Sequence, residues 1–221
     1  MLDTRLNMIY DLIPQSGLIC DIGADHCKLA IHAVKQGKTK YALATDLRRG
    51  PLEASARNVS ANSLSDRIRL LQSDGFLNIP ADIFDHTDCF VIAGMGGQVI
   101  QGILEGRHTD KWLVLQPMNA VYELCEYLAD AGYDIKKRVF CRDADKFYTA
   151  IICRHDGKKR NVSYFAGAVR DVNFSMFLEK ELNRIQTALH GISLARSPDM
   201  LQKQRLEHLR IILLEEKNNE S

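Results

Sequence analysis

The sequence predicts an α/β fold: a mostly parallel seven-stranded sheet that ends in an antiparallel hairpin, followed by an α-helical hairpin. Three observations lead to this prediction. Short apolar runs alternate with helical patterns from the start of the chain to about residue 132. Two strand-like segments, 133–141 and 147–153, then follow with only 142–146 between them. Near the end, leucine and isoleucine recur at alternating spacings of four and three residues.

Length and composition set the broad class. The 221 residues are enough for one substantial core and an appendage, and 46% hydrophobic with 26% charged residues is typical of a soluble globular protein. No apolar stretch approaches the roughly 20 residues that a membrane span needs, and the first residues lack the layout of a signal peptide. Six scattered cysteines indicate buried thiols in a reducing compartment. We therefore expect a cytoplasmic protein with no membrane partner.

Five apolar runs predict the parallel part of the sheet. Each run is nearly continuous rather than alternating, which is typical of strands buried on both faces. The predicted strands are residues 17–20, 41–45, 68–72, 89–93 and 112–116. Helical patterns precede or separate them at 4–13, 28–36, 52–62, 97 to about 104 and 120–131. We expect Asn119 or a neighbour to be the N-cap of the last helix.

The chain changes character after the fifth strand. The link 142–146 is too short for a crossover helix, so the two segments around it are predicted to form an antiparallel hairpin. We expect two domains: a sheet domain of residues 1–160 and a coiled-coil-like helical hairpin of residues 161–221. The first helix of that hairpin carries Leu178, Leu182, Ile185, Leu189 and Ile192 at heptad spacing. The second, introduced by Ser197 and Pro198, carries Leu201, Leu206, Leu209 and Leu213.

The turn after the first strand is the centre of the predicted site. It reads Asp21-Ile22-Gly23-Ala24-Asp25-His26, and Gly23 lets the backbone approach a ligand that a Cβ would push away. A pyrophosphate on this turn would meet the Asp25 carboxylate, and the pattern Gly-x-Gly-x-x-Gly is missing, so a nicotinamide dinucleotide is disfavoured. S-Adenosylmethionine carries an ammonium and a sulfonium but no phosphate, so acidic neighbours suit it. A tight turn without a ligand is the structural alternative.

Further candidates end the next strands, on the edge where ligands bind in such sheets. The second strand ends in an aspartate placed to accept the two ribose hydroxyls. A Ser-Asp-Gly turn ends the third strand, and its aspartate suits the adenine amino group, although Asp-Gly also makes plain turns. Glycines after the fourth strand either let a methyl group or a target base approach the backbone or form a tight turn alone. With Asp21, Gly23 and Asp25, the predicted cofactor-binding residues are Asp46, Ser73, Asp74, Gly75, Ala93, Gly94 and Met95.

Fewer residues are candidates for the reacting centre. Asp25 and His26 lie in the turn itself, and Gln116 ends the fifth strand at the same edge. We predict that Asp25 and His26 lie beside the reacting groups and that Gln116 orients the acceptor base. A histidine that merely starts a helix is the alternative for His26. No metal site is predicted, because the consecutive Asp25, His26 and Cys27 point in different directions.

The net charge of +1 gives no global signal for a nucleic-acid partner, so only local clusters bear on it. Residues 136–160 hold nine Lys or Arg against three Asp. This basic segment fits either a patch that contacts phosphates or lysines that protect an exposed hairpin edge. Residues 161–221 hold eight basic and eight acidic residues, which does not mark them as RNA-binding.

A mostly parallel sheet with a terminal antiparallel hairpin resembles the Rossmann-like S-adenosylmethionine methyltransferase fold. Four motifs narrow the resemblance: the turn 21–26, Ile-Ala-Gly-Met-Gly-Gly at 92–97, Leu-Gln-Pro at 115–117 and Lys-Phe-Tyr at 146–148. Together they resemble the bacterial tRNA (adenine-N1)-methyltransferase family that acts on position 22. The resemblance spans about residues 1–155 and extends to the helical hairpin. One departure is Met118, where asparagine often follows Gln-Pro in that family.

The resemblance implies S-adenosyl-L-methionine as cofactor, tRNA as partner and methyl transfer to adenine N1 as the reaction. N1 has its own in-plane lone pair, so the reaction needs in-line placement and exclusion of water more than a base. A clamp for an extruded base is expected, with Tyr148, Phe147 and Met95 as candidates. The alternatives are a methyltransferase for a small molecule or a protein, and a non-catalytic RNA-binding module of the same fold. The oligomeric state is not predicted.

Overall fold

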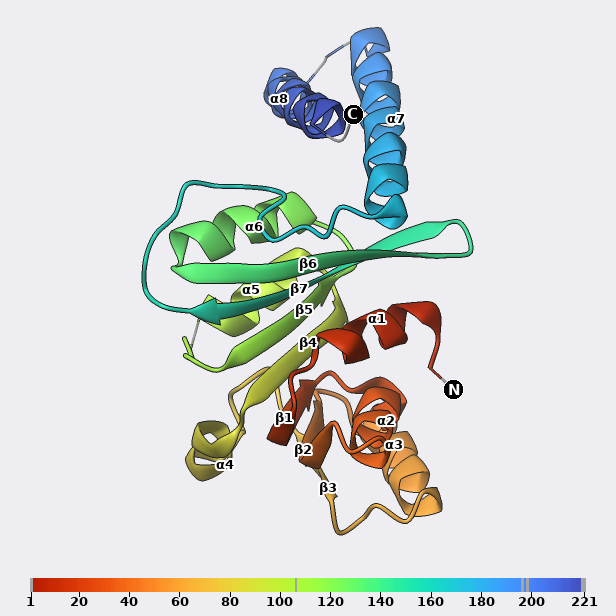
Figure 1. Ribbon diagram of the computed structural model, residues 1–221, viewed down its shortest axis with the longest axis vertical. Helices are drawn as coiled ribbons and strands as arrows, with labels where there is room; N and C mark the ends of the chain where they lie inside the picture. Colours follow the sequence, from red (N-terminus) through yellow and green to blue (C-terminus); the bar gives the residue numbers. More distant parts are fainter. Residues whose placement is uncertain (1, 106, 196, 198, 220–221) are drawn as a thin grey trace. The chain divides into compact units, whose positions relative to one another are not determined.

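The computed structural model describes residues 2–105, 107–195, 197 and 199–219, and it divides into two compact units, Met1–Ala168 and Val169–Ser221. The first unit contains a seven-stranded sheet (Figure 1). Its strands are β1 (Ser16–Ile22), β2 (Thr39–Asp46), β3 (Ile68–Gln72), β4 (Cys89–Met95), β5 (Trp112–Pro117), β6 (Tyr133–Asp143) and β7 (Lys146–His155).

The strand order is β3-β2-β1-β4-β5-β7-β6. Neighbours from β3 to β5 are parallel, whereas β7 runs antiparallel to both β5 and β6. The predicted sheet and its terminal hairpin are therefore confirmed. The order reverses at β1, between β2 and β4, which is the place where open α/β sheets form ligand crevices.

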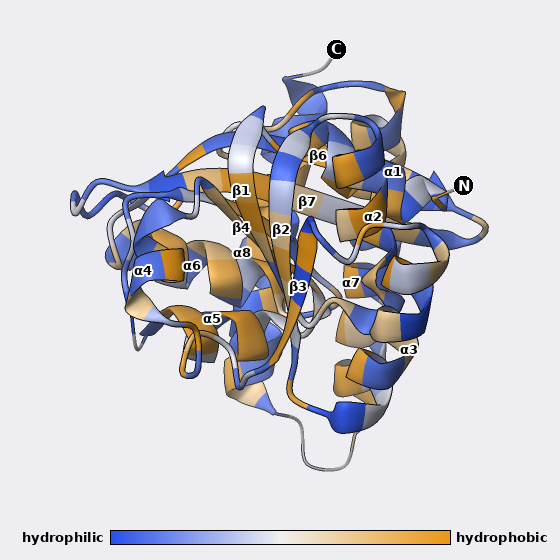
Figure 2. Ribbon diagram, turned by 90° about the horizontal axis from the view of Figure 1, so that it is seen from below, coloured by the Kyte–Doolittle hydropathy of each residue, from blue (hydrophilic) through white to orange (hydrophobic). Residues whose placement is uncertain are grey.

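Helices cover both faces of the sheet, because successive strand residues point to opposite sides. In β4, Val91 belongs to one core cluster, whereas Phe90 and Ile92 belong to the other. The first cluster includes residues of α1 (Thr4–Leu12), α2 (Lys28–Lys35) and α3 (Arg49–Ala61). The second includes residues of α4 (Ala81–His86), α5 (Gly97–Glu105) and α6 (Val121–Asp130). Figure 2 shows the apolar strands between these two groups of helices.

Two local features of the first unit differ from the sequence prediction. Helix α4 is not predicted, since six residues are too few to show a helical period. Helix α6 follows Ala120, which has a φ of 49°, and within the described residues no side chain caps it. The N-cap is thus Ala120, a neighbour of Asn119, rather than Asn119 itself. The backbone oxygen of Asn119 accepts a hydrogen bond from Gly97 N (3.0 Å), which ties the start of α6 to the turn after β4.

Residues 161–168, which the sequence analysis assigns to the helical hairpin, lie within the first unit. The Arg138 amide donates to Gly167 O (2.7 Å), and the Arg138 guanidinium donates to Tyr164 O and to Thr149 Oγ1 (3.0 Å). Arg138 is fully buried, with its guanidinium 5.5 Å from the centre of the Phe165 ring. This buried cation therefore fastens the segment to β6 and β7.

The second unit is a helical hairpin of α7 (Val172–Leu194) and α8 (Met200–Asn218), with Asp171 and Asp199 as N-caps. Its buried side chains are Phe174, Phe177, Leu178, Ile185, Leu206, Leu209 and Leu213. Leu201 is 79% exposed, so its predicted place in the seam is wrong; its spacing to Leu206 does not match the helical period. Asp199 rather than Ser197 is the cap, and Pro198 lies outside the described residues.

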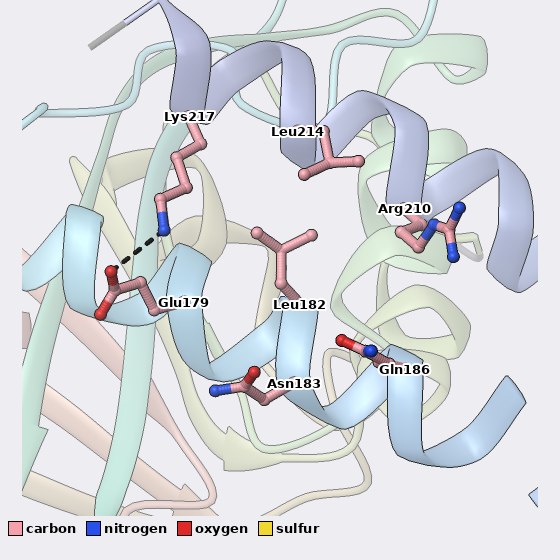
Figure 3. Close-up of a pocket in the computed structure, with 7 residues that line it drawn as sticks. All are labelled: Glu179, Leu182, Asn183, Gln186, Arg210, Leu214 and Lys217. Atoms are coloured by element: carbon pink, nitrogen blue, oxygen red, sulfur yellow. Dashed lines mark hydrogen bonds and ion pairs between the residues drawn. The ribbon is translucent and has the colours of Figure 1, made fainter. Parts of the chain in front are cut away.

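An open groove of about 490 Å³ runs between α7 and α8. Leu182 and Leu214 face one another across it (Figure 3). At one end Lys217 Nζ donates to Glu179 Oε1 at 3.0 Å. The predicted seam position Leu182 thus borders an open groove rather than a closed core. None of the helices within the described parts of the chain combines the length and apolarity needed to cross a membrane.

Candidate active site

A cleft of about 440 Å³ opens at the carboxyl ends of β1, β2 and β4. It brings together most of the predicted site residues, because parallel strands end on the same edge of the sheet. The predicted residues that line it are Asp21, Gly23, Asp25, His26, Asp46, Ala93, Gly94 and Met95. Ser73, Asp74, Gly75 and Gln116 do not line this cleft.

The turn after β1 is held in an unusual backbone conformation. Gly23 has a φ of 72°, and His26 and Cys27 have φ values of 56° and 58°. Left-handed residues other than glycine are uncommon and are found where the surroundings enforce them. Here Ala24 N donates to Thr45 O of β2 (2.8 Å), and Asn58 Nδ2 of α3 donates to His26 O (2.9 Å). Two neighbouring elements therefore fix the shape of the turn.

The side chains of Asp25 and His26 face solvent at the mouth of the cleft. They are 68% and 50% exposed, and Asp25 Oδ1 lies 3.6 Å from His26 Nε2. Both groups can therefore reach an incoming substrate without any movement of the core. Their predicted position beside the reacting groups is compatible with this placement.

Two buried aspartates stand deeper in the cleft. Asp21 is only 4% exposed, and burial raises the pKa of its carboxyl to about 7. Asp46 is also buried, and its Oδ1 accepts a hydrogen bond from Arg48 N (2.9 Å). A cationic ligand beside Asp21 would favour the ionised carboxylate and lower this pKa again. The floor of the cleft is thus suited to a cation.

Met95 covers the glycine of the turn. Its Cε occupies the space in which Gly23 would carry a Cβ. The Met95 side chain is flexible, so it can fill this space or leave it. The cleft therefore has an adaptable wall on the β4 side.

The Ser-Asp-Gly turn after β3 lies in a neighbouring hollow. Asp74 and Gly75 line this space of about 460 Å³ together with Val99 and Ile103 of α5. Ser73 is buried, and its Oγ donates to Gly75 O (2.9 Å) and accepts from Asn78 N (3.1 Å). Ser73 therefore braces the turn, whereas Asp74 and Gly75 are accessible to a ligand.

Gln116 is fully buried, and the protein itself uses its polar atoms. Its Oε1 accepts hydrogen bonds from Arg5 Nη1 (2.9 Å) and Gly94 N (3.2 Å), and its Nε2 donates to Pro117 O (2.8 Å). A β-bulge at Gly94 removes the Gly94 amide from the backbone hydrogen bonds between β4 and β5. This explains why the amide donates to the Gln116 side chain instead. The role of Gln116 in orienting an acceptor base stays a prediction; in this structure its side chain bonds to Arg5, Gly94 and Pro117.

Arg5 is a site residue that the sequence reasoning missed. It stands on α1 and lines the cleft, and its Cζ lies 6.0 Å from the centre of the Tyr148 ring. Tyr148 and Phe147, the predicted aromatic clamp, are both half-buried on β7. No local pattern could identify Arg5, because its partner Gln116 is 111 positions away in the sequence.

Comparison with known proteins places the chain in a family. A family model described as "Methyltransferase domain" matches residues 2–151. The tRNA (adenine(22)-N(1))-methyltransferase of Bacillus subtilis (strain 168) is 30% identical in an alignment 233 positions long, which covers 97% of this chain and 96% of the relative. The chain belongs to the tRNA (adenine(22)-N(1))-methyltransferase family. It is therefore a methyltransferase.

Solved structures agree with this family over nearly the whole chain. Sp1610 of Streptococcus pneumoniae in complex with S-adenosyl-L-methionine is 26% identical with a TM-score of 0.83, covering 98% of this chain and 100% of the other. TrmK of M. capricolum in complex with S-adenosyl-homocysteine is 25% identical with a TM-score of 0.83, covering 99% of this chain and 98% of the other. The B. subtilis M1A22 tRNA methyltransferase TrmK is 25% identical with a TM-score of 0.82, over 98% and 99%. In the described part of this chain, no cluster of three or more His, Cys, Asp or Glu is arranged to hold a metal.

Proposed function

We propose that this protein transfers the methyl group of S-adenosyl-L-methionine to N1 of adenine 22 in tRNA. The observation that carries the proposal is the match to the B. subtilis enzyme over almost the full length of both chains. The cleft at the edge of the sheet supplies a site of suitable chemistry, because two buried carboxylates and a glycine turn face the same space.

The strand order orients the cofactor. From β3 through β2 and β1 to β4, the sheet edge presents Asp74, Asp46, Asp21 and Gly94 in turn. S-Adenosylmethionine laid along this edge runs in the same direction, from the adenine and the ribose to the sulfonium and its amino-acid end, which then lies between Asp21 and Gly94. Asp74 and Gly75 then face the adenine, and Asp46 accepts the ribose hydroxyls. Asp21 faces the ammonium, and Gly23 allows the chain of the ligand to lie against the backbone once Met95 turns aside.

The chemistry needs no strong base. The N1 lone pair attacks the methyl carbon, the carbon–sulfur bond breaks towards sulfur, and the positive charge moves from the sulfonium to the adenine ring. A carboxylate beside N1 stabilises that developing charge. Asp25 suits this role, since it is exposed at the mouth of the cleft. His26 lies beside it and completes the polar wall.

The tRNA approaches from the side of the clamp. The extruded adenine stacks against Tyr148 or Phe147, both half-buried on β7; Tyr148 lies beside Arg5 of α1. The β6–β7 hairpin adds Arg142 and Lys146, exposed side chains that can contact phosphates.

The helical hairpin of α7 and α8 forms a second domain. Residues 161–168 belong with the methyltransferase domain, so the boundary falls near Ala168.

A cytoplasmic location is part of the same proposal. The six cysteines are free and buried. Free thiols are typical of a reducing compartment. Substrate tRNA is available in that compartment as well.

The test is methyl transfer with product analysis. Purified full-length protein is mixed with S-adenosylmethionine labelled in its methyl group and an unmodified tRNA transcript. The RNA is then digested and its nucleosides are separated. We expect label in 1-methyladenosine. Cofactor binding without label in RNA would favour a small-molecule or protein substrate, and RNA binding without cofactor binding would favour a non-catalytic module.

A further inference from the structure

We propose that Arg5 binds the carboxylate at the amino-acid end of the cofactor and that Gln116 holds Arg5 in the required position. The inference rests on the proposed function, since it assigns a group of the same cofactor. It adds a residue on α1, outside the motifs at the strand ends, to the binding site.

The position of Arg5 is well determined by its neighbours. Its helix is capped by Asp3, whose Oδ1 accepts from Leu6 N at 2.7 Å, and the helix packs through Ile9, which is fully buried. At its tip, Arg5 Nη1 donates to Gln116 Oε1 at 2.9 Å. A guanidinium has five N–H donors, so this hydrogen bond leaves further donors for a ligand. The Arg5 guanidinium is therefore held in one position at the lining of the cleft.

Gln116 connects Arg5 to the turn after β4. The same Oε1 accepts from Gly94 N at 3.2 Å, and Arg5 Nη1 lies 3.6 Å from the place where Gly94 would carry a Cβ. Gly94 has a φ of 75°, which lets the backbone bend beneath the guanidinium without a side chain in the way. The missing Cβ at Gly94 thus leaves room beside Arg5 on the cleft side.

The charges in the cleft match a zwitterion. The lining contains the carboxylates of Asp3, Asp21, Asp25 and Asp46 and the cations of Arg5, Lys28 and Arg48. Arg48 follows β2, on the ribose side, and Lys28 is exposed at the start of α2. Arg5 donates a hydrogen bond to Gln116 of β5 and lies beside Gly94 of β4. It is therefore far from β3 in the strand order, on the side where the proposed orientation puts the amino-acid end of the cofactor. An ammonium beside Asp21 and a carboxylate beside Arg5 would pair both charges of that end.

The experiment compares ligands that differ only at this end. Isothermal titration of the full-length protein uses S-adenosylmethionine, its decarboxylated form and 5′-methylthioadenosine, which lacks the whole amino-acid end. For the wild-type protein we expect decarboxylation to weaken binding by about tenfold or more. Equal affinity for the two forms would overturn the proposal without any variant. Failure to bind all three ligands would instead contradict the proposed function.

Variants of Arg5 and Gln116 show whether these residues recognise the carboxylate of the cofactor. Arg5→Met removes the cation and leaves Gln116 Oε1 paired with Gly94 N, so the fold is retained. We expect roughly tenfold or greater loss for S-adenosylmethionine, with unchanged or improved binding of the decarboxylated form. Gln116→Leu should lower the ratio of the affinity for S-adenosylmethionine to the affinity for its decarboxylated form. A general loss of structure would weaken both ligands alike and leave this ratio unchanged. Arg57→Met, at an exposed position of α3, is the matched control. Equal losses for all three ligands in Arg5→Met would overturn the assignment.

Discussion

The methyl group of Met95 occupies the space in which Gly23 would carry a Cβ. Gly23 follows β1 and Met95 ends the neighbouring strand β4, so the contact lies in the cleft at the point where the sheet order reverses. A ligand that lies against Gly23 must displace a flexible thioether side chain rather than backbone. This relationship makes the glycine turn sensitive to any added atom.

We expect Gly23→Ala to abolish detectable cofactor binding. The new methyl would meet Met95, and alanine at a φ of 72° costs about 1–2 kcal/mol. Titration with S-adenosylhomocysteine and thermal unfolding measure the two effects. Gly50→Ala is the control, because nothing lies within 4 Å of its Cβ position. Wild-type affinity in Gly23→Ala would show that the ligand does not approach this turn.

Asp46 is expected to hold the ribose. Asp46→Ala should weaken S-adenosylhomocysteine by roughly 10- to 100-fold, since a carboxylate that accepts hydroxyl hydrogen bonds contributes about 1.5–3 kcal/mol. Titration of Asp66→Ala, an exposed aspartate between α3 and β3, provides the comparison. Unchanged affinity in Asp46→Ala, with a fold like that of the wild type, would remove Asp46 from the site.

Asp21 should make stability depend on pH. Its pKa is raised from 3.8 when unfolded to about 7 when folded, so the unfolded state loses its proton first as the pH rises. The contribution to the free energy of unfolding is full below about pH 4 and is lost as the pH rises through 7, by roughly 4 kcal/mol at most. Urea unfolding at pH 5 and 7.5 should show a smaller pH effect in Asp21→Asn. An identical effect in both proteins would contradict the buried acid.

The same aspartate should couple cofactor binding to proton release. An ammonium beside Asp21 favours the carboxylate, so the affinity for S-adenosylmethionine should rise as the pH increases from 5.5 to 7. Calorimetry in buffers of different ionisation enthalpy measures the released proton. Asp21→Asn should bind with no such release below pH 7, and a release that persists in this variant would assign the proton to another group.

Arg138 should hold residues 161–168 against the sheet. Arg138→Met removes the hydrogen bonds to Tyr164 O and Thr149 Oγ1 from a buried site, and we expect a loss of about 3 kcal/mol in the free energy of unfolding. Amide hydrogen exchange should accelerate within 161–168. Arg142→Met, on the exposed end of the same strand, should leave both unchanged. Unaltered exchange in Arg138→Met would mean that other contacts hold the segment.

The sequence predicted the parts of the fold that have a strong period. Continuous apolar runs identified the strands, and the short link 142–146 identified the antiparallel hairpin, because both signals are local. Helix α4 was missed because it is only six residues long, and Leu201 was misplaced because a leucine pattern does not show which face is covered. Residues 161–168 are held by contacts with Arg138, which is too distant in the sequence for any local pattern to indicate the contact.

The candidate site shows the same division. Asp21, Gly23 and Asp46 could be predicted because strand ends share one edge of a parallel sheet. Arg5 could not, since its place depends on a contact between α1 and β5. Gln116 could be placed at the end of its strand, but its burial and its three partners could not be predicted, because tertiary packing sets them.

Methyl transfer to two tRNA transcripts shows whether adenine 22 is the acceptor. One transcript has adenine at position 22, and the other differs only by guanine at that position. Both are incubated with the full-length protein and labelled S-adenosylmethionine. We expect label in the first transcript alone. Equal label in both would contradict the assignment of the acceptor, and label in neither, with cofactor binding confirmed, would contradict tRNA as the substrate.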